Sequence, residues 1–161
     1  QYGNVLNIDM TEQQLVMVVP KTFTDRLFGA QAEEVRRQYA QGADIQAFEH
    51  LPFVLIKRGN RTRNIVDQYF SRYYFKPQLI LETENTVTTL AMAQAGVGIT
   101  ICPELFLRAI PTPPHDSEGV DLFPLTDPST FSKLVAGYRK SRYLSHFGQR
   151  FIEITQDILE E

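Results

Sequence analysis

The side chains best suited to chemistry in this sequence are the cations of one short loop. Lys57, Arg58, Arg61 and Arg63 place four positive charges within seven residues, directly after the apolar strand expected at 53–56. A helix is expected to begin within this loop, so unpaired backbone N–H groups and the positive end of a helix dipole would lie beside the cations. Such a combination suits a carboxylate or a phosphate.

Asn60 or Thr62 can cap that helix. Arg58 lies nearest the strand end and is expected to reach a ligand, whereas Arg61 and Arg63 are expected to face water. The alternative is a solvated basic loop whose arginines pair with nearby surface acids. The sequence alone leaves both interpretations open.

A second polar segment follows the strand expected at 79–81. Thr83, Glu84, Asn85 and Thr86 offer hydroxyls, an amide and a carboxylate at the start of another helix. Ligands of open α/β sheets bind at such carboxyl ends of strands. The alternative is structural, since Thr83, Asn85 or Thr86 can serve simply as the helix N-cap.

Signals for catalysis, metal binding or a cofactor are missing. The glycines at 96–98 follow a helix and precede a strand, the reverse of a nucleotide-binding loop, so they predict a left-handed helix cap. Cys102 ends an apolar strand and is expected to be buried and inert. A small α/β enzyme would need Cys102 exposed beside a histidine base. The three histidines are isolated in the sequence and lack metal-ligand spacing: His50, His115 and His146.

Strands separated by helices organise the chain around these loops. The expected strands are 14–19, 53–56, 79–81, 98–102, 120–125 and 133–138. The expected helical segments are 23–42, a short helix capped by Asp44, 63–75, 87–95, 104–109 and 144–159. The alternation predicts an α/β protein with a mostly parallel sheet, and 79–102 reads as one β-α-β unit.

Composition sets further bounds. With 161 residues and a hydrophobic fraction of 43%, the chain can bury a substantial core. A net charge of −3 argues against a nucleic-acid surface over the whole domain. The single cysteine fits a reducing cytoplasm, and no apolar run reaches the roughly 20 residues of a membrane span. The first ten residues look like the tail of something else, and 111–119 looks like a linker.

The segment ILETENTVTTLAMAQAGVGITICPELFL resembles the effector-binding domain of LysR-type transcriptional regulators. Three further segments fall in the order of that family: EQQLVMVVP, LPFVLIKRGNRTRNIVDQYF and KLVAGYRKSRYLSHFGQRFIEI. The resemblance runs from about residue 11 to residue 159.

This resemblance implies a periplasmic-binding-protein-like fold (type 2) of two α/β subdomains joined by two crossovers, with the effector between them. Residues 21–125 would form subdomain II. Residues 1–20 and 126–161 would be a remnant of subdomain I. The family's N-terminal winged helix-turn-helix and the first part of subdomain I do not occur in this sequence. Carried over by position, the effector-binding residues would be Arg58, Gly59, Asn60, Arg61, Thr62, Thr83, Glu84, Asn85, Thr86, Pro103 and, as a weaker candidate, Thr24.

The function implied is that of a cytoplasmic ligand sensor and not of an enzyme. A small anionic effector would favour one arrangement of the subdomains. DNA would be bound only through the absent N-terminal domain, and the full-length protein would be a homodimer or tetramer. A transporter's solute-binding protein with the same fold is the alternative.

Overall fold

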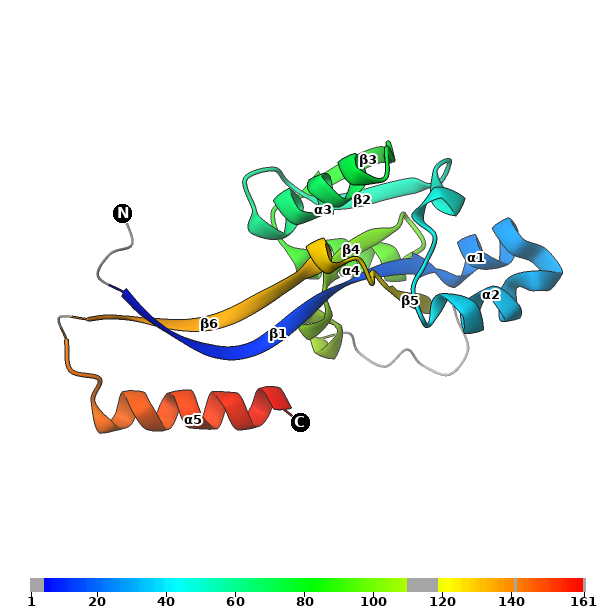
Figure 1. Cartoon of the computed structure of the whole chain (residues 1–161). Coiled ribbons are helices and arrows are strands. Elements are labelled where there is room, and N and C mark those ends of the chain that lie inside the picture. The colour runs from blue at the N-terminus through cyan, green and yellow to red at the C-terminus, as the bar shows by residue number, and fades with distance from the viewer. Residues whose placement is uncertain (1–4, 110–118, 141, 161) are drawn as a thin grey trace. The chain divides into compact units, whose positions relative to one another are not determined.

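The computed structural model describes residues 5–109, 119–140 and 142–160, and these divide into two compact units (Figure 1). The larger unit is Gln14–Thr130, and the smaller unit is Gln1–Gln13 with Phe131–Glu161. The strand β1 (Val5–Pro20) passes from one unit into the other. The chain returns to the smaller unit at Thr130 and Phe131, where β6 (Phe131–Arg139) begins. The linker expected at 111–119 falls largely outside the described residues.

The sheet of the larger unit is mixed. β1 pairs antiparallel with β4 (Thr100–Pro103) and with β5 (Val120–Pro124). β2 (Pro52–Ile56) pairs parallel with β3 (Gln78–Thr83), and a parallel bridge from Phe53 to Ile99 links β2 to β4. The prediction of a mostly parallel sheet is therefore wrong for the ladders of β1, although it holds for β2 and β3. An apolar run shows that a strand is buried but carries no information about its direction.

Helices cover both faces of this sheet. α3 (Arg61–Arg72) and α4 (Thr86–Gln94) follow β2 and β3, while α1 (Lys21–Phe28) and α2 (Ala32–Tyr39) follow β1. Met17 of β1 packs in a core cluster with Val66 of α3, whereas the adjacent Val18 packs with Leu90 of α4 and Cys102. Successive residues of a strand face opposite sides, so the two clusters lie on the two faces.

Shorter 3₁₀ turns complete the larger unit: η1 (Gly29–Gln31), η2 (Ile45–Phe48), η3 (Glu104–Ala109) and η4 (Pro128–Thr130). The helix expected over 23–42 is divided at Gly29, where φ is +53° and favours glycine. Asp44 caps η2 as predicted, because its Oδ1 accepts from the Gln46 amide at 3.0 Å. Gly96 has the left-handed φ (+75°) expected for a helix cap.

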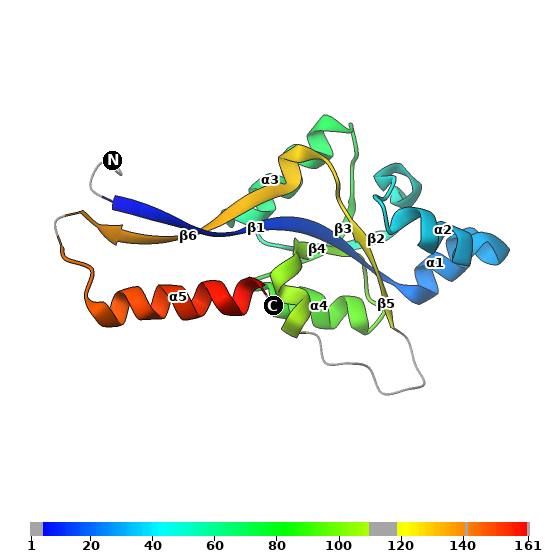
Figure 2. The ribbon, with the colours of Figure 1, turned by 60° about the horizontal axis from the view of Figure 1, so that its bottom comes forward.

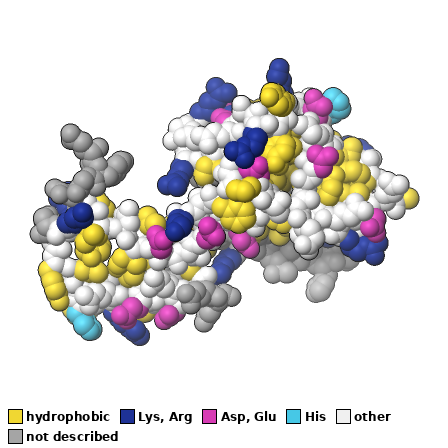
Figure 3. All heavy atoms as spheres, viewed as in Figure 1, with side chains coloured by type: hydrophobic (Ala, Val, Ile, Leu, Met, Phe, Trp, Pro, Cys, Tyr) yellow, Lys and Arg dark blue, Asp and Glu magenta, His cyan; other side chains and the backbone are white. Residues whose placement is uncertain are grey.

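The smaller unit contains the first part of β1, β6 alongside it, and α5 (His146–Glu160) (Figures 1 and 2). Of residues 1–10, interpreted from the sequence as the tail of something else, Val5–Met10 lie within β1. The predicted C-terminal amphipathic helix is present, but its apolar face is open: Phe147 is 86% exposed and Phe151 is 71% exposed. Apolar side chains are accordingly visible at the surface of this unit (lower left in Figure 3).

Candidate functional site

The cationic loop and the polar turn lie side by side at one edge of the sheet. Ile56, the last residue of β2, is in register with Thr83, the last residue of β3, and the Lys57 amide donates to the Thr83 carbonyl at 2.8 Å. β4 runs parallel to both strands and ends nearby at Pro103. Both α3 and α4 begin at this edge, which we call the carboxyl edge.

Local hydrogen bonds in the loop define the start of α3. The Asn60 Oδ1 accepts from the Thr62 amide at 2.8 Å, so Asn60 is the N-cap. Gly59 has a φ of +92°, a conformation that other residues rarely adopt. Arg61 is exposed and Thr62 is half-buried. The loop therefore holds the first turn of α3 in place and directs its amides toward the carboxyl edge.

The turn before α4 uses part of its polar groups internally. The Asn85 Oδ1 accepts from the Thr88 amide at 2.9 Å, and the Thr83 hydroxyl donates to the Asn85 carbonyl at 2.9 Å. Glu84 forms an ion pair with Lys57 across the edge. Thr86 is buried. The predicted N-cap role thus belongs to Asn85, and what the turn leaves for a ligand is the first amides of α4.

Arg63 does not face water, contrary to the prediction. Its side chain is 3% exposed and donates to Asp67 at 2.8 Å, to the Ile56 carbonyl at 2.9 Å and to Glu82. Burial lowers the pKa of Arg63, but its hydrogen bonds to Asp67 and Glu82 outweigh that effect and leave the pKa raised. Arg63 is therefore a structural cation that ties α3 to β2 and β3.

Arg58 has the opposite environment. Its side chain is 81% exposed, and the nearest carboxylate in the described part of the chain is that of Asp67, at 4.0 Å from Nε. The side chain lies on the flank of α3 beside Asp67 and Lys76. Arg58 is thus an exposed cation whose side chain lies along the helix flank. That it reaches a ligand stays a prediction.

Thr24 lies apart from the other candidate residues. It belongs to α1, which follows the end of β1, and that end is in register with the first residues of β4 and β5. The side chain of Thr24 is fully buried, and its Oγ1 has no hydrogen-bond partner among the described residues. The structure therefore brings together ten of the eleven candidates by position and leaves Thr24 at the opposite edge.

Cys102 and the histidines were the residues considered for catalysis or metal binding. Cys102 is fully buried, and burial raises the pKa of its thiol to about 12. His50 is exposed and His115 lies outside the described residues. Across residues 5–109, 119–140 and 142–160, no group of three His, Cys, Asp or Glu side chains could hold a metal ion. Within the same ranges, no helix is long and apolar enough to cross a membrane.

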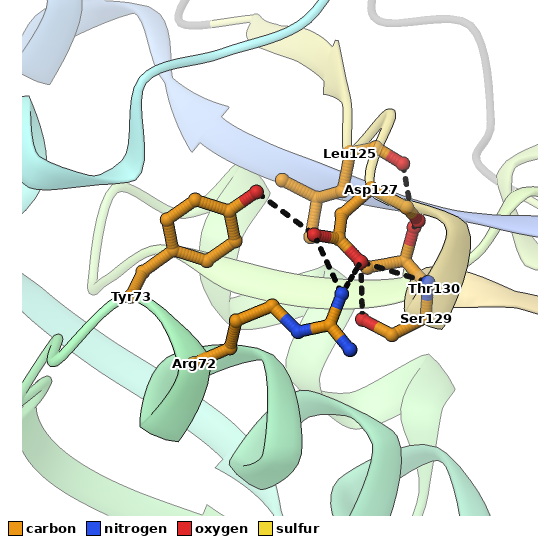
Figure 4. A network of polar contacts seen from close by, with 6 residues as sticks. All are labelled: Arg72, Tyr73, Leu125, Asp127, Ser129 and Thr130. Atoms are coloured by element: carbon orange, nitrogen blue, oxygen red, sulfur yellow. Dashed lines mark hydrogen bonds and ion pairs between the residues drawn. The ribbon is translucent and has the colours of Figure 1, made fainter.

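A hydrogen-bond network around Asp127 was not anticipated from the sequence (Figure 4). The carboxylate accepts from the Ser129 hydroxyl (2.5 Å) and amide (2.8 Å), from the Tyr73 hydroxyl (2.8 Å) and from Arg72 (3.0 Å). The Ser129 bonds, followed by those of Tyr73 and Arg72, hold the pKa of Asp127 well below its usual range. The sequence signal was Asp127-Pro128-Ser129-Thr130, an Asp-initiated turn.

This network fixes the last segment of the larger unit before β6. Thr130 is fully buried, and its hydroxyl donates to the Leu125 and Asp127 carbonyls at 2.6 Å each. The turn also contacts the C-terminal end of α3 through Arg72. The network is saturated with internal partners, so it has a structural role.

Fold and site together define a class: a mixed α/β domain with a cationic edge at which two helices begin. Residues 10–160 match the family model described as LysR substrate binding domain. The chain belongs to this family of transcription-regulator domains, which are not enzymes. The match gives no support to the alternative of a transporter's solute-binding protein.

Known relatives agree with this assignment. The chain is 30% identical over 108 residues to an uncharacterized HTH-type transcriptional regulator, YwbI, of Bacillus subtilis (strain 168). The aligned region covers 67% of this chain and 34% of the relative. The chain thus spans about a third of the length of the curated relatives it matches.

Two solved structures have the same fold. The effector-binding domain of QuiR in complex with shikimate has a TM-score of 0.67 at 16% identity, over 98% of this chain and 66% of that one. Full-length CbnR complexed with target DNA has a TM-score of 0.68 at 16% identity, over 100% of this chain and 50% of that one. Proteins of this fold therefore include one bound to a small effector and one bound to DNA.

Proposed function

We propose that this chain senses a small anionic effector at the carboxyl edge of its larger unit, as part of a LysR-type regulator. The observation that carries the proposal is the convergence at one edge of two helix N-termini with Lys57 and Arg61. Dipoles and amides of α3 and α4 favour negative charge there. Arg63 contributes no binding, because its donors are already engaged.

The binding residues follow from position and from what each group still has available. Lys57 and Arg61 would supply charge, and Lys57 would exchange Glu84 for the ligand. The first amides of α3 and α4 would donate hydrogen bonds, with Asn60 and Asn85 holding the helix starts in place. Gly59, Thr62, Thr83, Thr86 and Pro103 would shape the edge. Thr24 is not included, because it is buried at the opposite edge.

The ligand of the QuiR domain supports an anionic effector for this chain. Shikimate, bound by the QuiR domain, is a carboxylate with several hydroxyls. A carboxylate is matched by paired amides at a helix N-terminus, and hydroxyls are matched by short polar side chains such as those at 83–86. The effector of this chain is therefore expected to be a small polar carboxylate or phosphate.

Signal transmission would depend on the strands that pass between the units. β1 passes from one unit into the other at Gln13 and Gln14, and the chain returns at Thr130 and Phe131, where β6 begins. An effector that prefers one arrangement of the units would shift their equilibrium by its differential affinity. DNA binding would reside in a part of the cytoplasmic regulator outside this chain, acting as a homodimer or tetramer.

A titration followed by amide resonances tests this proposal. Shikimate and, separately, inorganic phosphate are added to the ¹⁵N-labelled chain. Saturable shifts are expected at the amides of Arg61, Thr86 and Val87, because these lie in the first turns of α3 and α4 and are not used by the Asn60 and Asn85 caps. Arg150→Ala, which removes an exposed cation paired with Glu153 in α5, should leave the shifts unchanged. Shifts spread evenly over basic side chains of both units would contradict the proposal.

A further inference from the structure

A polar pocket lies at the edge of the larger unit opposite the carboxyl edge. It lies between the start of α1 and the C-terminal end of α4 and encloses about 320 Å³. That volume is at the lower end of the range of small-molecule sites, about 300–1,000 Å³. The lining residues that carry its chemistry are Thr22, Phe23, Arg26, Gln94 and Ala95. The pocket shares no residue with the carboxyl edge.

The start of α1 supplies hydrogen-bond donors to this pocket. α1 follows Pro20, and no side chain caps it. The Lys21 amide donates to the Gly119 carbonyl at 3.0 Å. The next two amides, of Thr22 and Phe23, have no acceptor among the described residues, because the first amides of a helix lack an intrahelical partner. They also carry the positive end of the dipole of α1.

Arg26 adds a full positive charge to the same wall. Its side chain is exposed and forms no ion pair with the part of the chain that the structure describes. The one acid of α1, Asp25, is engaged by Arg36 at 2.6 Å. This wall therefore matches a carboxylate, which would accept from two amides and pair with a guanidinium.

The end of α4 supplies acceptors on the opposite wall. α4 closes with the long hydrogen bond of a Schellman motif, in which the Val97 amide donates to the Met92 carbonyl at 3.0 Å. The last two carbonyls, of Gln94 and Ala95, accept no hydrogen bond from the described residues. They carry the negative end of the dipole of α4, so this wall matches an ammonium group.

Two buried hydroxyls at this edge also lack hydrogen-bond partners among the described residues. They are those of Thr24 in α1 and Thr100 at the start of β4, and both side chains are fully buried. Thr100 is in register with Val18, which packs with Ala93 of α4, so Thr100 lies on the face that α4 covers. Because buried polar groups are nearly always paired, this edge has hydrogen-bonding capacity that the described chain does not use.

We propose that this pocket binds a small zwitterion of the α-amino-acid class. Its carboxylate accepts from the Thr22 and Phe23 amides and pairs with Arg26, while its ammonium group donates to the Gln94 and Ala95 carbonyls. A phosphate or a simple carboxylate would satisfy only the wall of α1, and a simple amine only that of α4. The inference does not depend on the function proposed for the carboxyl edge.

Titration of L-alanine into the ¹⁵N-labelled chain tests this inference. Saturable shifts are expected at the Thr22 and Phe23 amides. Propanoate lacks the ammonium group of L-alanine, and ethylamine lacks its carboxylate. Each should bind about tenfold more weakly, because each loses one set of charge-assisted hydrogen bonds. The carboxyl edge is followed separately through the Thr86 and Val87 amides, so failure at one site is distinguished from failure at the other.

Two variants separate the walls of the pocket. Arg26→Met removes the cation beside α1 and should weaken L-alanine and propanoate alike, each about tenfold. Ala95→Lys places an ammonium group at the end of α4, where it competes with that of the ligand. It should weaken L-alanine about tenfold without weakening propanoate. A cation is favourable at a helix C-terminus, so the thermal unfolding midpoint of Ala95→Lys should not fall below that of the wild type.

Arg37→Met is the matched control, because Arg37 is an exposed arginine in the last turn of α2, as Arg26 is in the last turn of α1. Its affinity for L-alanine should equal that of the wild type. The inference is overturned if L-alanine gives no saturable shifts at Thr22 and Phe23, or if Arg26→Met binds it as tightly as the wild type does. Equal affinities for propanoate and L-alanine would overturn it too, because the pocket would then be a simple anion site.

Discussion

Arg58 and Arg63 belong to the same cationic loop, yet their environments are opposite. Arg63 is buried and binds Asp67, Glu82 and the Ile56 carbonyl. Arg58 is 81% exposed, with its nearest carboxylate at 4.0 Å. Asp127 extends the comparison, because its side chain is only 7% exposed and its carboxylate is saturated with donors. Polar groups with every partner internal hold the fold together, whereas those left unsatisfied at an edge are available for a ligand.

The largest effect should come from breaking the saturated Asp127 network. Asp127→Ala leaves Arg72, Tyr73 and Ser129 without their shared acceptor, so the free energy of unfolding should fall by about 3 kcal/mol in urea denaturation. Glu153→Ala is the control, since its exposed pair with Arg150 is worth about 0–1 kcal/mol. If the free energy of unfolding falls no more for Asp127→Ala than for the control, the hydrogen bonds around Asp127 do not stabilise the fold as proposed.

The same network should give stability a specific pH dependence. The pKa of Asp127 is lower in the folded chain than the usual value of about 4 in the unfolded one, so its contribution is complete above that value. As the pH falls below about 4, the advantage of the wild type over Asp127→Asn should shrink by at most about 1.4 kcal/mol per pH unit. A difference that stays constant down to pH 3 would contradict the lowered pKa. Urea denaturation of both proteins at several pH values measures it.

Replacing each of the two arginines should give effects of intermediate size and tests the difference between them directly. Arg63→Met should lower the free energy of unfolding by about 2 kcal/mol, because Asp67 and Glu82 lose their partner but remain partly solvated. Arg58→Met should change it by no more than about 0.5 kcal/mol. If the free energy of unfolding falls equally in the two variants, Arg63 is no more important to the fold than Arg58, and the account is wrong on this point.

The smallest expected effect is the absence of a reaction at Cys102. Burial and a thiol pKa of about 12 should keep the native chain unreactive toward a thiol reagent at neutral pH. Modification should begin only when denaturant unfolds the larger unit. Rapid modification of the folded chain would mean that the second core cluster is open to solvent.

Local chemistry could be predicted from the sequence. The caps at Asn60, Asn85 and Asp44 were among the predicted ones, because a side chain accepts from an amide only two or three residues away. The proximity of the loop and the turn followed from two consecutive strands that end at one edge of a parallel pair.

Features set by distant parts of the chain could not be predicted. The direction of β1 depends on how the chain enters the larger unit, which its apolar run does not encode. The burial of Arg63 depends on Glu82, which comes from the next strand. In the sequence Asp127 looks like an ordinary turn residue, because Arg72 and Tyr73 reach it only in the folded chain.

A phosphate titration across three variants tests the central claim most directly. Dissociation constants for inorganic phosphate are measured from the Thr86 and Val87 amide shifts, alongside urea denaturation of each protein. Lys57→Ala with Arg61→Ala should weaken binding and leave stability nearly unchanged, whereas Arg63→Met should lower stability and leave binding unchanged. Arg150→Ala should change neither. The reverse pattern, in which Arg63→Met abolishes phosphate binding and the double variant does not, would contradict the account.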